Sequence, residues 1–256
     1  LDEIVITLGL AEYHKLGRIV NMCEKSGVHT KFVPDYNNII PTKPYTEDLM
    51  GMPVINIRRV PLNNMLNAVA KRCVDIFGAL VAIILFSPVM LVTSIIIKVT
   101  SPGPLIFKQE RIGKHNHPFY MYKFRSMVVQ DEKDEKKGWT TKNDPRVTPI
   151  GRFIRKTSID ELPQLINILK GDMTIVGPRP ERPEIAAQYE EILPEFALRL
   201  QVKAGLTGYA QVYGKYNTTP YDKLQMDLMY ISKPSLLEDL RIIFATIKIL
   251  FVPEST

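Results

Sequence analysis

The sequence predicts a mixed α/β protein that contains one membrane-embedded segment. Three observations support this fold class: a strand–helix–strand pattern near the start, a long uncharged stretch at residues 77–97, and ordinary charge density over residues 101–256. The chain has 256 residues, of which 45% are hydrophobic and 23% charged, enough for one or two domains with a sizeable core. This composition excludes a wholly disordered chain, a collagen and a disulfide-rich scaffold.

The chain carries a moderate excess of positive charge. Lys and Arg number 33 and Asp and Glu 27, which gives a net charge of +6 and a pI of 9.1. Such a balance favours an anionic partner, namely nucleic acid, a phosphorylated substrate or an anionic membrane surface. We expect no nucleic acid, because the basic residues form no concentrated stripe. His115-Asn116-His117 spells a nuclease motif, but the further ligands of such a metal site are not evident.

Residues 1–60 begin with a small α/β pattern. Residues 4–8 and 30–33 have the β-branched, apolar composition of short strands, and residues 11–25 carry apolar side chains at helical spacing until Ser26-Gly27. This order predicts a βαβ unit. It contains no glycine-rich nucleotide-binding motif, so we expect a packing or oligomerisation role.

A linker is predicted over residues 35–53, which include Pro41, Pro44 and Pro53. A two-stranded βαβ unit cannot bury both of its faces, and Leu1 is not a methionine. We therefore expect this chain to be part of a longer protein. Its two cysteines have no metal-site spacing, which favours a reducing compartment.

Residues 77–97 contain no charged side chain. A single helix over them would be about 31 Å long, close to the roughly 30 Å hydrocarbon core of a bilayer. Ser87-Pro88 lies near the middle, and proline kinks or breaks a helix because it lacks the backbone donor. Two half-length arms would then enter and leave by one membrane face, with the Ser87 hydroxyl bonded to a freed carbonyl. On pattern alone, this re-entrant hairpin and a kinked spanning helix are equally compatible with the sequence.

Residues 101–256 resemble an ordinary soluble domain in charge. Residues 130–137 (QDEKDEKK) predict a solvated loop or helix face. Residues 236–251 predict a helix that is apolar around most of its circumference and carries Asp239, Arg241 and Lys248. Such a helix fits either the core or the headgroup layer of a membrane.

Asp160 and Glu161 are the strongest candidates for chemistry. Ser158 and Glu161 match an S-x-x-E capping box, which predicts that both carboxylates lie in the first turn of a helix, ionised by its dipole. Ordinary capping explains most isolated motifs of this kind, but Arg155 and two further basic residues stand directly upstream. A carboxylate beside phosphate-binding cations can act as a nucleophile or hold a divalent metal.

Two further clusters carry cations. Lys123 and Arg125 alternate with aromatic residues, as on a strand that turns its charged face toward a site. Arg179 stands between Pro178 and Pro180, which stiffen the backbone and preset the direction of the side chain. A planar guanidinium suits bidentate binding of phosphate. Each cluster taken alone is also compatible with ordinary surface charge.

Four long motifs occur in a fixed order between residues 65 and 252. They are KRxxDIxGALxxxxxxSP, FKQERIGxxxxPFxMYKFRSM, IRKTSIDELPQLxNxLKGDMTIVGPRP and KAGLTGYAQVYG. In this combination the chain resembles the bacterial sugar transferases, the monotopic phosphoglycosyl transferases that start glycan assembly on polyprenyl phosphate. Residues 1–60 resemble the end of the Rossmann-like domain that precedes the catalytic domain in larger members.

The resemblance implies a monotopic membrane protein with a re-entrant helix over residues 61–100, broken at Ser87-Pro88. That helix enters only the cytoplasmic leaflet of the bacterial inner membrane. Residues 101–256 then form a compact α/β catalytic domain that faces the cytoplasm and ends in an interfacial helix. The partial Rossmann-like piece, residues 1–60, lies outside the catalytic unit and is compatible with a homodimer.

The resemblance also implies a reaction. A sugar-1-phosphate passes from a UDP-sugar, which we expect to be a UDP-hexose, to undecaprenyl phosphate, and UMP is released. This is the first membrane step of exopolysaccharide, capsule or O-antigen assembly. Asp160 matches the nucleophile, which forms a covalent phosphosugar intermediate, and Glu161 matches its partner in placing Mg²⁺. Five residues match substrate-binding positions: Lys123, Arg125, Arg155, Arg179 and Asp227.

Two other functions stay open at the level of sequence. The first is a non-catalytic membrane scaffold, in which the basic residues bind lipid headgroups. The second is a metal-dependent membrane phosphohydrolase that uses the same two carboxylates without a lipid acceptor.

Overall fold

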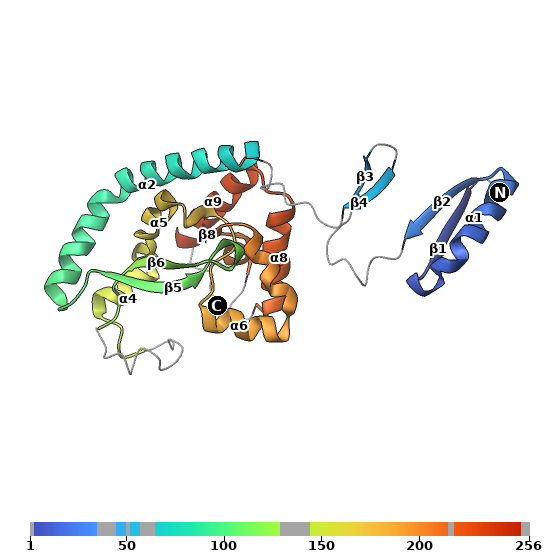
Figure 1. Ribbon diagram of the computed structural model, residues 1–256. Helices are drawn as coiled ribbons and strands as arrows, with labels where there is room; N and C mark the ends of the chain where they lie inside the picture. Colours follow the sequence, from blue (N-terminus) through green and yellow to red (C-terminus); the bar gives the residue numbers. More distant parts are fainter. Residues whose placement is uncertain are drawn as a thin grey trace. The chain divides into compact units, whose positions relative to one another are not determined.

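The computed structural model describes residues 3–34, 45–49, 52–56, 65–128, 144–214 and 218–251 (Figure 1). The chain divides into two compact units, Leu1–Arg59 and Val60–Thr256. The predicted charge run at residues 130–137 lies outside the described residues. Helices and strands are mixed throughout, as the sequence predicts.

The first unit begins with the predicted βαβ arrangement. Its elements are β1 (Glu3–Leu8), the 3-10 helix η1 (Leu10–Lys15), α1 (Leu16–Ser26) and β2 (His29–Pro34). The two strands pair in parallel, and Gly27 ends α1 with a positive φ of 68°, a conformation that glycine adopts without strain. Two strands and one helix do not by themselves define a Rossmann-like domain, so that part stays a prediction.

The predicted linker contains a β-hairpin, so the prediction was wrong for that part. β3 (Tyr45–Leu49) and β4 (Met52–Asn56) pair antiparallel. Pro53 lies within β4 opposite Asp48, which a two-stranded ribbon tolerates because each strand has an edge whose amides need no partner. Pro41 and Pro44 lie outside the described residues.

The uncharged stretch forms the centre of one long helix, α2 (Met65–Thr100), with Pro88 inside it. The predicted break at Ser87-Pro88 was wrong, because the helix continues through it as a single curved element (Figure 1). The expected role of the serine is confirmed: the Ser87 hydroxyl donates to the Ile84 carbonyl at 2.8 Å. The Ile84 carbonyl lies four residues before the proline. It would otherwise accept from the backbone N–H at position 88, which proline lacks.

α2 exposes much of its apolar surface. Within the described part of the chain it is the one helix long and apolar enough to cross a membrane, with a mean hydropathy of 2.7 in its best window. Phe77 and Ile84 are 71% and 73% exposed. Exposed apolar surface on this scale marks a membrane or protein contact, so the fold is compatible with monotopic membrane association.

Both ends of α2 contact the rest of the second unit. Near its start, Lys71 pairs with Asp239 at 2.6 Å, and the Asp75 carboxylate accepts a bond from Thr174 at 2.6 Å. Near its end, Ile97 is fully buried in a hydrophobic cluster. Because buried ion pairs and apolar contacts act at opposite ends, the helix is held along its length against one body.

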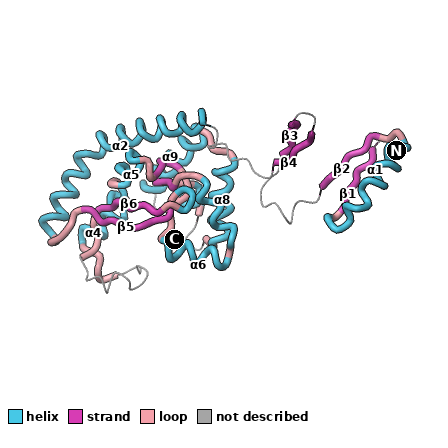
Figure 2. The backbone as a smooth tube through the Cα atoms, in the orientation of Figure 1, coloured by secondary structure: helices cyan, strands magenta, loops and turns pink. Residues whose placement is uncertain are grey.

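The second unit builds two short sheets surrounded by helices (Figure 2). Strands β5 (Ile106–Ile112) and β6 (Pro118–Phe124) form an antiparallel hairpin, and β7 (Met173–Val176) pairs in parallel with β8 (Ala204–Thr207). The helices are α4 (Pro149–Lys156), α5 (Gln164–Lys170), α6 (Pro183–Ile192), α7 (Tyr209–Tyr213), α8 (Pro220–Ser232) and α9 (Leu236–Phe251). Three 3-10 turns join them: η3 (Lys114–Asn116), η4 (Ile159–Glu161) and η5 (Pro194–Gln201).

Three hydrophobic clusters hold these elements together. One joins α2, β6, α5 and β7 through Ala79, Met121, Leu165, Ile168 and Met173. A second joins β7, α8 and α9 around Val176, Tyr230 and Ile242, and a third joins α2, β6 and α4 around Ile97. α9 therefore belongs to the core through Ile242, while Leu237 and Phe244 on its other side are 71% and 68% exposed. The core interpretation is confirmed for one face, and the headgroup layer stays a prediction for the exposed apolar face.

Replacing Asp75 by alanine should destabilise the unit that contains α2. The change leaves Lys71 without one of its partners and Thr174 without its acceptor, and breaking a buried ionic network costs about 3 kcal/mol. Urea unfolding of the full chain in neutral detergent measures this cost. Glu184→Gln, which removes an exposed carboxylate, should change the free energy by less than about 0.5 kcal/mol. A loss below about 1 kcal/mol for Asp75→Ala would contradict the proposed attachment.

Candidate active site

Asp160 and Glu161 lie in the turn η4 between α4 and α5. The predicted capping box was wrong, because Ser158 adopts a left-handed conformation (φ 54°) and its side chain makes no capping bond. Ser158 instead follows the end of α4, donating its backbone N–H to the Arg155 carbonyl, and left-handed residues are common at that position. The dyad does lie in the first turn of a helix, as predicted, but that helix is the single 3-10 turn η4 that precedes α5.

Glu161 is clamped by two cations from distant parts of the chain. Lys123, near the end of β6, approaches Oε1 at 2.8 Å, and Arg179 approaches the same oxygen at 2.6 Å. Burial alone would raise the pKa of Glu161, but the Arg179 and Lys123 charges outweigh it and lower the pKa to about 2. Glu161 is thus a permanently ionised residue of the site.

Asp160 is in a different electrostatic position. Its side chain is buried, with 7% of the residue exposed. Burial raises the pKa of Asp160, and the Lys123 and Arg155 charges offset this only in part while Glu161 adds to it. Among the described residues, no ion pair holds its carboxylate, and the hydrogen bond that lowers its pKa comes from its own backbone, so the carboxylate lies beside cations without being paired to one.

The predicted pair Lys123 and Arg125 is not brought together by the structure. Lys123 contacts Glu161, but Arg125 follows the end of β6 and points elsewhere. Its guanidinium donates to the carbonyls of Ser101 at 2.6 Å and Pro102 at 2.7 Å. Arg125 therefore fastens the segment that follows α2, and this placement does not support the predicted phosphate contact.

Arg155 lies beside the dyad on α4. Its Nε donates to the Ser126 hydroxyl at 2.9 Å, which orients the side chain and leaves the terminal nitrogens for other partners. α4 itself is fixed by Thr148, whose side chain accepts from the Gly151 amide. Ser126 lies in the motif that ends in KFRSM, but nothing in the sequence alone indicates that it orients Arg155.

Arg179 is positioned by backbone contact between two glycine-containing motifs. Gly177 donates to the Thr207 carbonyl at 2.8 Å, and Gly205 donates to the Pro178 carbonyl at 2.9 Å. A Cβ on Gly205 would lie 2.2 Å from the Gly177 nitrogen, so glycine is required for this approach. The glycines of both motifs therefore serve the placement of Arg179, in addition to the two prolines that flank it.

Asp227 belongs to a neighbouring network rather than to the dyad. It pairs with Arg199 at 2.6 Å, and Arg199 also pairs with Glu181, which contacts Lys223. Arg199 donates to the Arg179 carbonyl at 2.8 Å, so this network supports Arg179 from behind. Burial raises the pKa of Asp227, and Arg199 opposes that rise. Arg199 and Lys223 were missed because nothing in their local sequence distinguishes them from other charged helical residues.

Arg111 is a further cation of the site. Burial and the nearby Arg179 charge lower the pKa of Arg111 to about 10. It donates to the Pro180 carbonyl at 3.1 Å and to Gln109 at 2.6 Å. Its position within the FKQERIG motif was the sequence signal that could have identified it.

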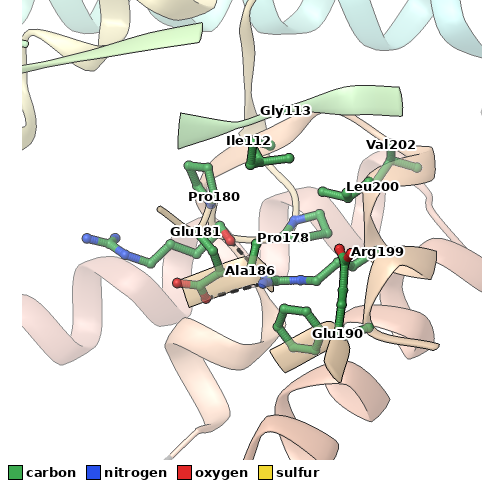
Figure 3. Close-up of a pocket in the computed structure, with 13 residues that line it drawn as sticks. Ile112, Gly113, Pro178, Pro180, Glu181, Ala186, Glu190, Arg199, Leu200 and Val202 are labelled. Atoms are coloured by element: carbon green, nitrogen blue, oxygen red, sulfur yellow. Dashed lines mark hydrogen bonds and ion pairs between the residues drawn. The ribbon is translucent and has the colours of Figure 1, made fainter. Parts of the chain in front are cut away.

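A small pocket adjoins Arg179. Its walls come from the end of β5, the segment 178–181, α6 and η5, and they are mostly apolar, with Phe196 and Leu200 among them. Figure 3 shows the Glu181 carboxylate joined to the Arg199 guanidinium beside it. The cavity therefore combines an apolar wall with a charged edge next to the dyad.

The residues present fit a magnesium site that a substrate completes. Within the described ranges, no three carboxylate, imidazole or thiol groups converge on one point. Asp160 and Glu161 supply two carboxylates, and Mg²⁺ is commonly held by one or two carboxylates together with substrate phosphates and water. The donor set therefore suits a metal that arrives with a phosphorylated substrate, rather than an all-protein cage.

Comparison with known proteins decides the family. The model of the bacterial sugar transferase family matches residues 66–253. The chain belongs to this family. The predicted resemblance is thereby confirmed, and the match includes α2, the dyad and every candidate cation described above.

Several family members of known name are similar to this chain. The UDP-glucose:undecaprenyl-phosphate glucose-1-phosphate transferase of Klebsiella pneumoniae is 38% identical over 252 residues, covering 96% of this chain and 54% of that protein. The UDP-N-acetylgalactosamine-undecaprenyl-phosphate N-acetylgalactosaminephosphotransferase of Aeromonas hydrophila is 45% identical over 71% of this chain and 43% of that protein. An exopolysaccharide production protein of Rhizobium leguminosarum bv. phaseoli is 40% identical over 71% of this chain and 95% of that protein. The chain spans about half the length of the first two relatives.

The clamp on Glu161 predicts a stability that depends on pH. The folded pKa is about 2 against an ordinary 4.5, so the ion pairs stabilise the fold above pH 4.5 and lose that effect as pH falls toward 2. The contribution is on the order of 3 kcal/mol. Glu161→Gln should therefore be less stable than wild type at pH 6, and the gap should shrink at pH 3. Urea unfolding in detergent at both pH values measures it, with Glu184→Gln as the exposed control. A gap that is the same at both pH values would argue against the clamp.

Proposed function

We propose that this family member transfers a sugar-1-phosphate from a UDP-sugar to undecaprenyl phosphate and releases UMP. The observation that carries the proposal is the division of roles within the dyad. Glu161 is paired with Lys123 and Arg179, whereas Asp160 is buried beside cations and is paired with none of them. One carboxylate is thus structural and electrostatic, and the other is available to attack.

The first step forms a bond between an Asp160 carboxylate oxygen and the β-phosphorus of the UDP-sugar. The bond from that phosphorus to the bridging oxygen breaks, and UMP leaves with the electron pair. The product is an aspartyl-phosphosugar. In the second step an oxygen of undecaprenyl phosphate attacks the same phosphorus, and the Asp160 carboxylate leaves unchanged. The fixed cations supply the stabilisation that the phosphate oxygens need as charge shifts.

The raised pKa of Asp160 serves this attack. A more basic carboxylate is a stronger nucleophile, and Lys123 and Arg155 still favour its ionised form. We assign Arg179, which contacts Glu161 of the dyad, to the diphosphate. When bound, Mg²⁺ would neutralise phosphate oxygens, and Asp160 and Glu161 are the residues that would hold it.

We further propose that α2 is re-entrant and that the site faces the cytoplasm. The support is that both ends of α2 are attached to one polar body, through Lys71 and Asp75 at one end and Ile97 at the other. A polar body cannot lie on both sides of a bilayer at once. Basic residues flank the apolar stretch, which favours the cytoplasmic side.

The named relatives use different sugars, glucose in one case and N-acetylgalactosamine in another. We propose a UDP-hexose or UDP-N-acetylhexosamine as donor for this chain. The product then enters the assembly of an extracellular or surface glycan, which the exopolysaccharide production relative supports.

Asp160→Asn should abolish transfer while leaving the fold intact. An amide cannot act as the nucleophile, and loss of a covalent nucleophile costs at least about a thousandfold in kcat. UMP release from a panel of UDP-sugars, with undecaprenyl phosphate in detergent, measures the rate. Asp222→Asn makes the same change from carboxylate to carboxamide at an exposed position at the start of α8. This variant should keep the wild-type rate.

The same assay separates the alternatives. Normal turnover by Asp160→Asn would contradict the nucleophile assignment. Release of free sugar phosphate without a lipid acceptor would favour the phosphohydrolase. Absence of any product from wild type with every donor would favour the membrane scaffold.

A further inference from the structure

A second, open cavity lies beside the first turns of α2. Four cationic side chains and one carboxylate are among the residues that line it: Lys71, Arg72, Lys114, Lys203 and Asp75. They come from α2, from the β5–β6 loop and from the segment before β8. Residues far apart in the chain thus converge on one basic space.

The single carboxylate is already satisfied. Asp75 accepts from the Thr174 hydroxyl at 2.6 Å and from the Ile175 amide at 3.1 Å. Lys71 lies 3.3 Å from Asp75 and 2.6 Å from Asp239. Lys71 thus lies between two carboxylates, and this trio carries one net negative charge, which the other three cations of the cavity outweigh.

Arg72 donates its hydrogen bonds to uncharged partners. Its Nη1 and Nη2 donate to the carbonyls of Ile168 and Leu169 at 2.5 and 2.8 Å. The point that a Cβ on Gly171 would occupy is 3.4 Å from Arg72 Nη2 and 3.6 Å from Lys203 Nζ. The two cationic groups therefore approach the same small space.

Lys203 and Lys114 add like charge to the cavity. In the described part of the chain, no ion pair joins either lysine to a carboxylate. Burial lowers the pKa of Lys203, and the nearby Arg72 and Lys114 charges lower it further, while Asp75 and Asp172 oppose that change in part. Crowded cations destabilise a fold unless an anion compensates them.

Lys114 is held in place at a local cost. The two residues after it, His115 and Asn116, have positive φ values of 54° and 63°. Such values are uncommon outside glycine and cost free energy. The loop keeps this conformation although it brings one more cation to an already basic cavity.

We propose that this cavity binds a phosphate anion, presented either as the headgroup of an anionic phospholipid or as free phosphate. Its position at the start of the apolar helix α2, where Met65 and Val69 are 80% and 52% exposed, places it beside surface suited to acyl chains. It is separate from the dyad, because Arg72 contacts the end of α5 whereas Asp160 precedes its start. The site does not depend on the proposed transfer reaction.

Binding is measured on the full chain in neutral detergent. The probes are inorganic phosphate, dihexanoyl phosphatidylglycerol and, as a zwitterionic reference, dihexanoyl phosphatidylcholine. The double variant Lys114→Gln/Lys203→Gln should weaken anion binding at least about tenfold. Lys98→Gln, a matched change at the other end of α2, should stay within about twofold of wild type.

Each outcome has a distinct meaning. Tighter binding of phosphatidylglycerol than of phosphate, lost in the double variant, identifies a headgroup site. Equal binding of both anions, lost in the double variant, identifies a free-phosphate site. Unchanged binding in the double variant overturns the proposal. Lys203→Arg should retain binding, which distinguishes lost charge from lost folding, and Arg179→Gln should also retain it, which separates this cavity from the dyad.

Discussion

The structure depends on the attachment of α2 to one body at both of its ends. At its start, Lys71 and Asp75 enter a buried ionic network with Asp239 and Thr174. At its end, Ile97 is buried against Phe124 and Ile154, and the segment just beyond is fastened by Arg125. A helix with this much exposed apolar surface cannot remain in water, and the body attached to it is too polar to enter lipid. The membrane surface is the location that satisfies both constraints.

The same attachment brings the site to the membrane. β6, which carries Lys123, and α5, which follows the dyad, both pack in the cluster that contains Ala79 of α2. Under the proposed function the acceptor is a polyprenyl phosphate, whose phosphate lies at the level of the headgroups, so a dyad on elements packed against α2 is suited to meet it there. Within the dyad, Lys123 and Arg179 form ion pairs with Glu161, whereas the buried Asp160 carboxylate forms none with them. Position and charge are therefore set by the same small group of packed elements.

Local patterns in the sequence were sufficient for several elements. The βαβ unit followed from periodicity and from the Ser26-Gly27 stop, and the bond from Ser87 to the Ile84 carbonyl followed from the geometry of proline. The continuity of α2 through Pro88 did not, because tertiary contacts at Ala79, Thr93 and Ile97 offset a local penalty that the sequence alone shows.

The residues of the candidate site also divide into those that the sequence predicts and those that it does not. Asp160, Glu161, Lys123 and Arg179 were found by motif, and the structure brings them together. Arg125 was misjudged because alternation on a strand predicts a shared direction, but β6 ends at Phe124. Asp227 and Arg199 meet through contacts between η5 and α8 that no local spacing encodes.

The most direct test asks on which side of the membrane the two ends of α2 lie. Cys73 is exposed near the start of α2, and Lys98→Cys in a Cys73→Ser background places a thiol near its end. A membrane-impermeant maleimide is applied to spheroplasts and to inverted vesicles, with a permeant maleimide as the control for reactivity. We expect both thiols to react in inverted vesicles and neither to react in spheroplasts. Labelling of either thiol in spheroplasts would show that α2 spans the membrane and would contradict the account.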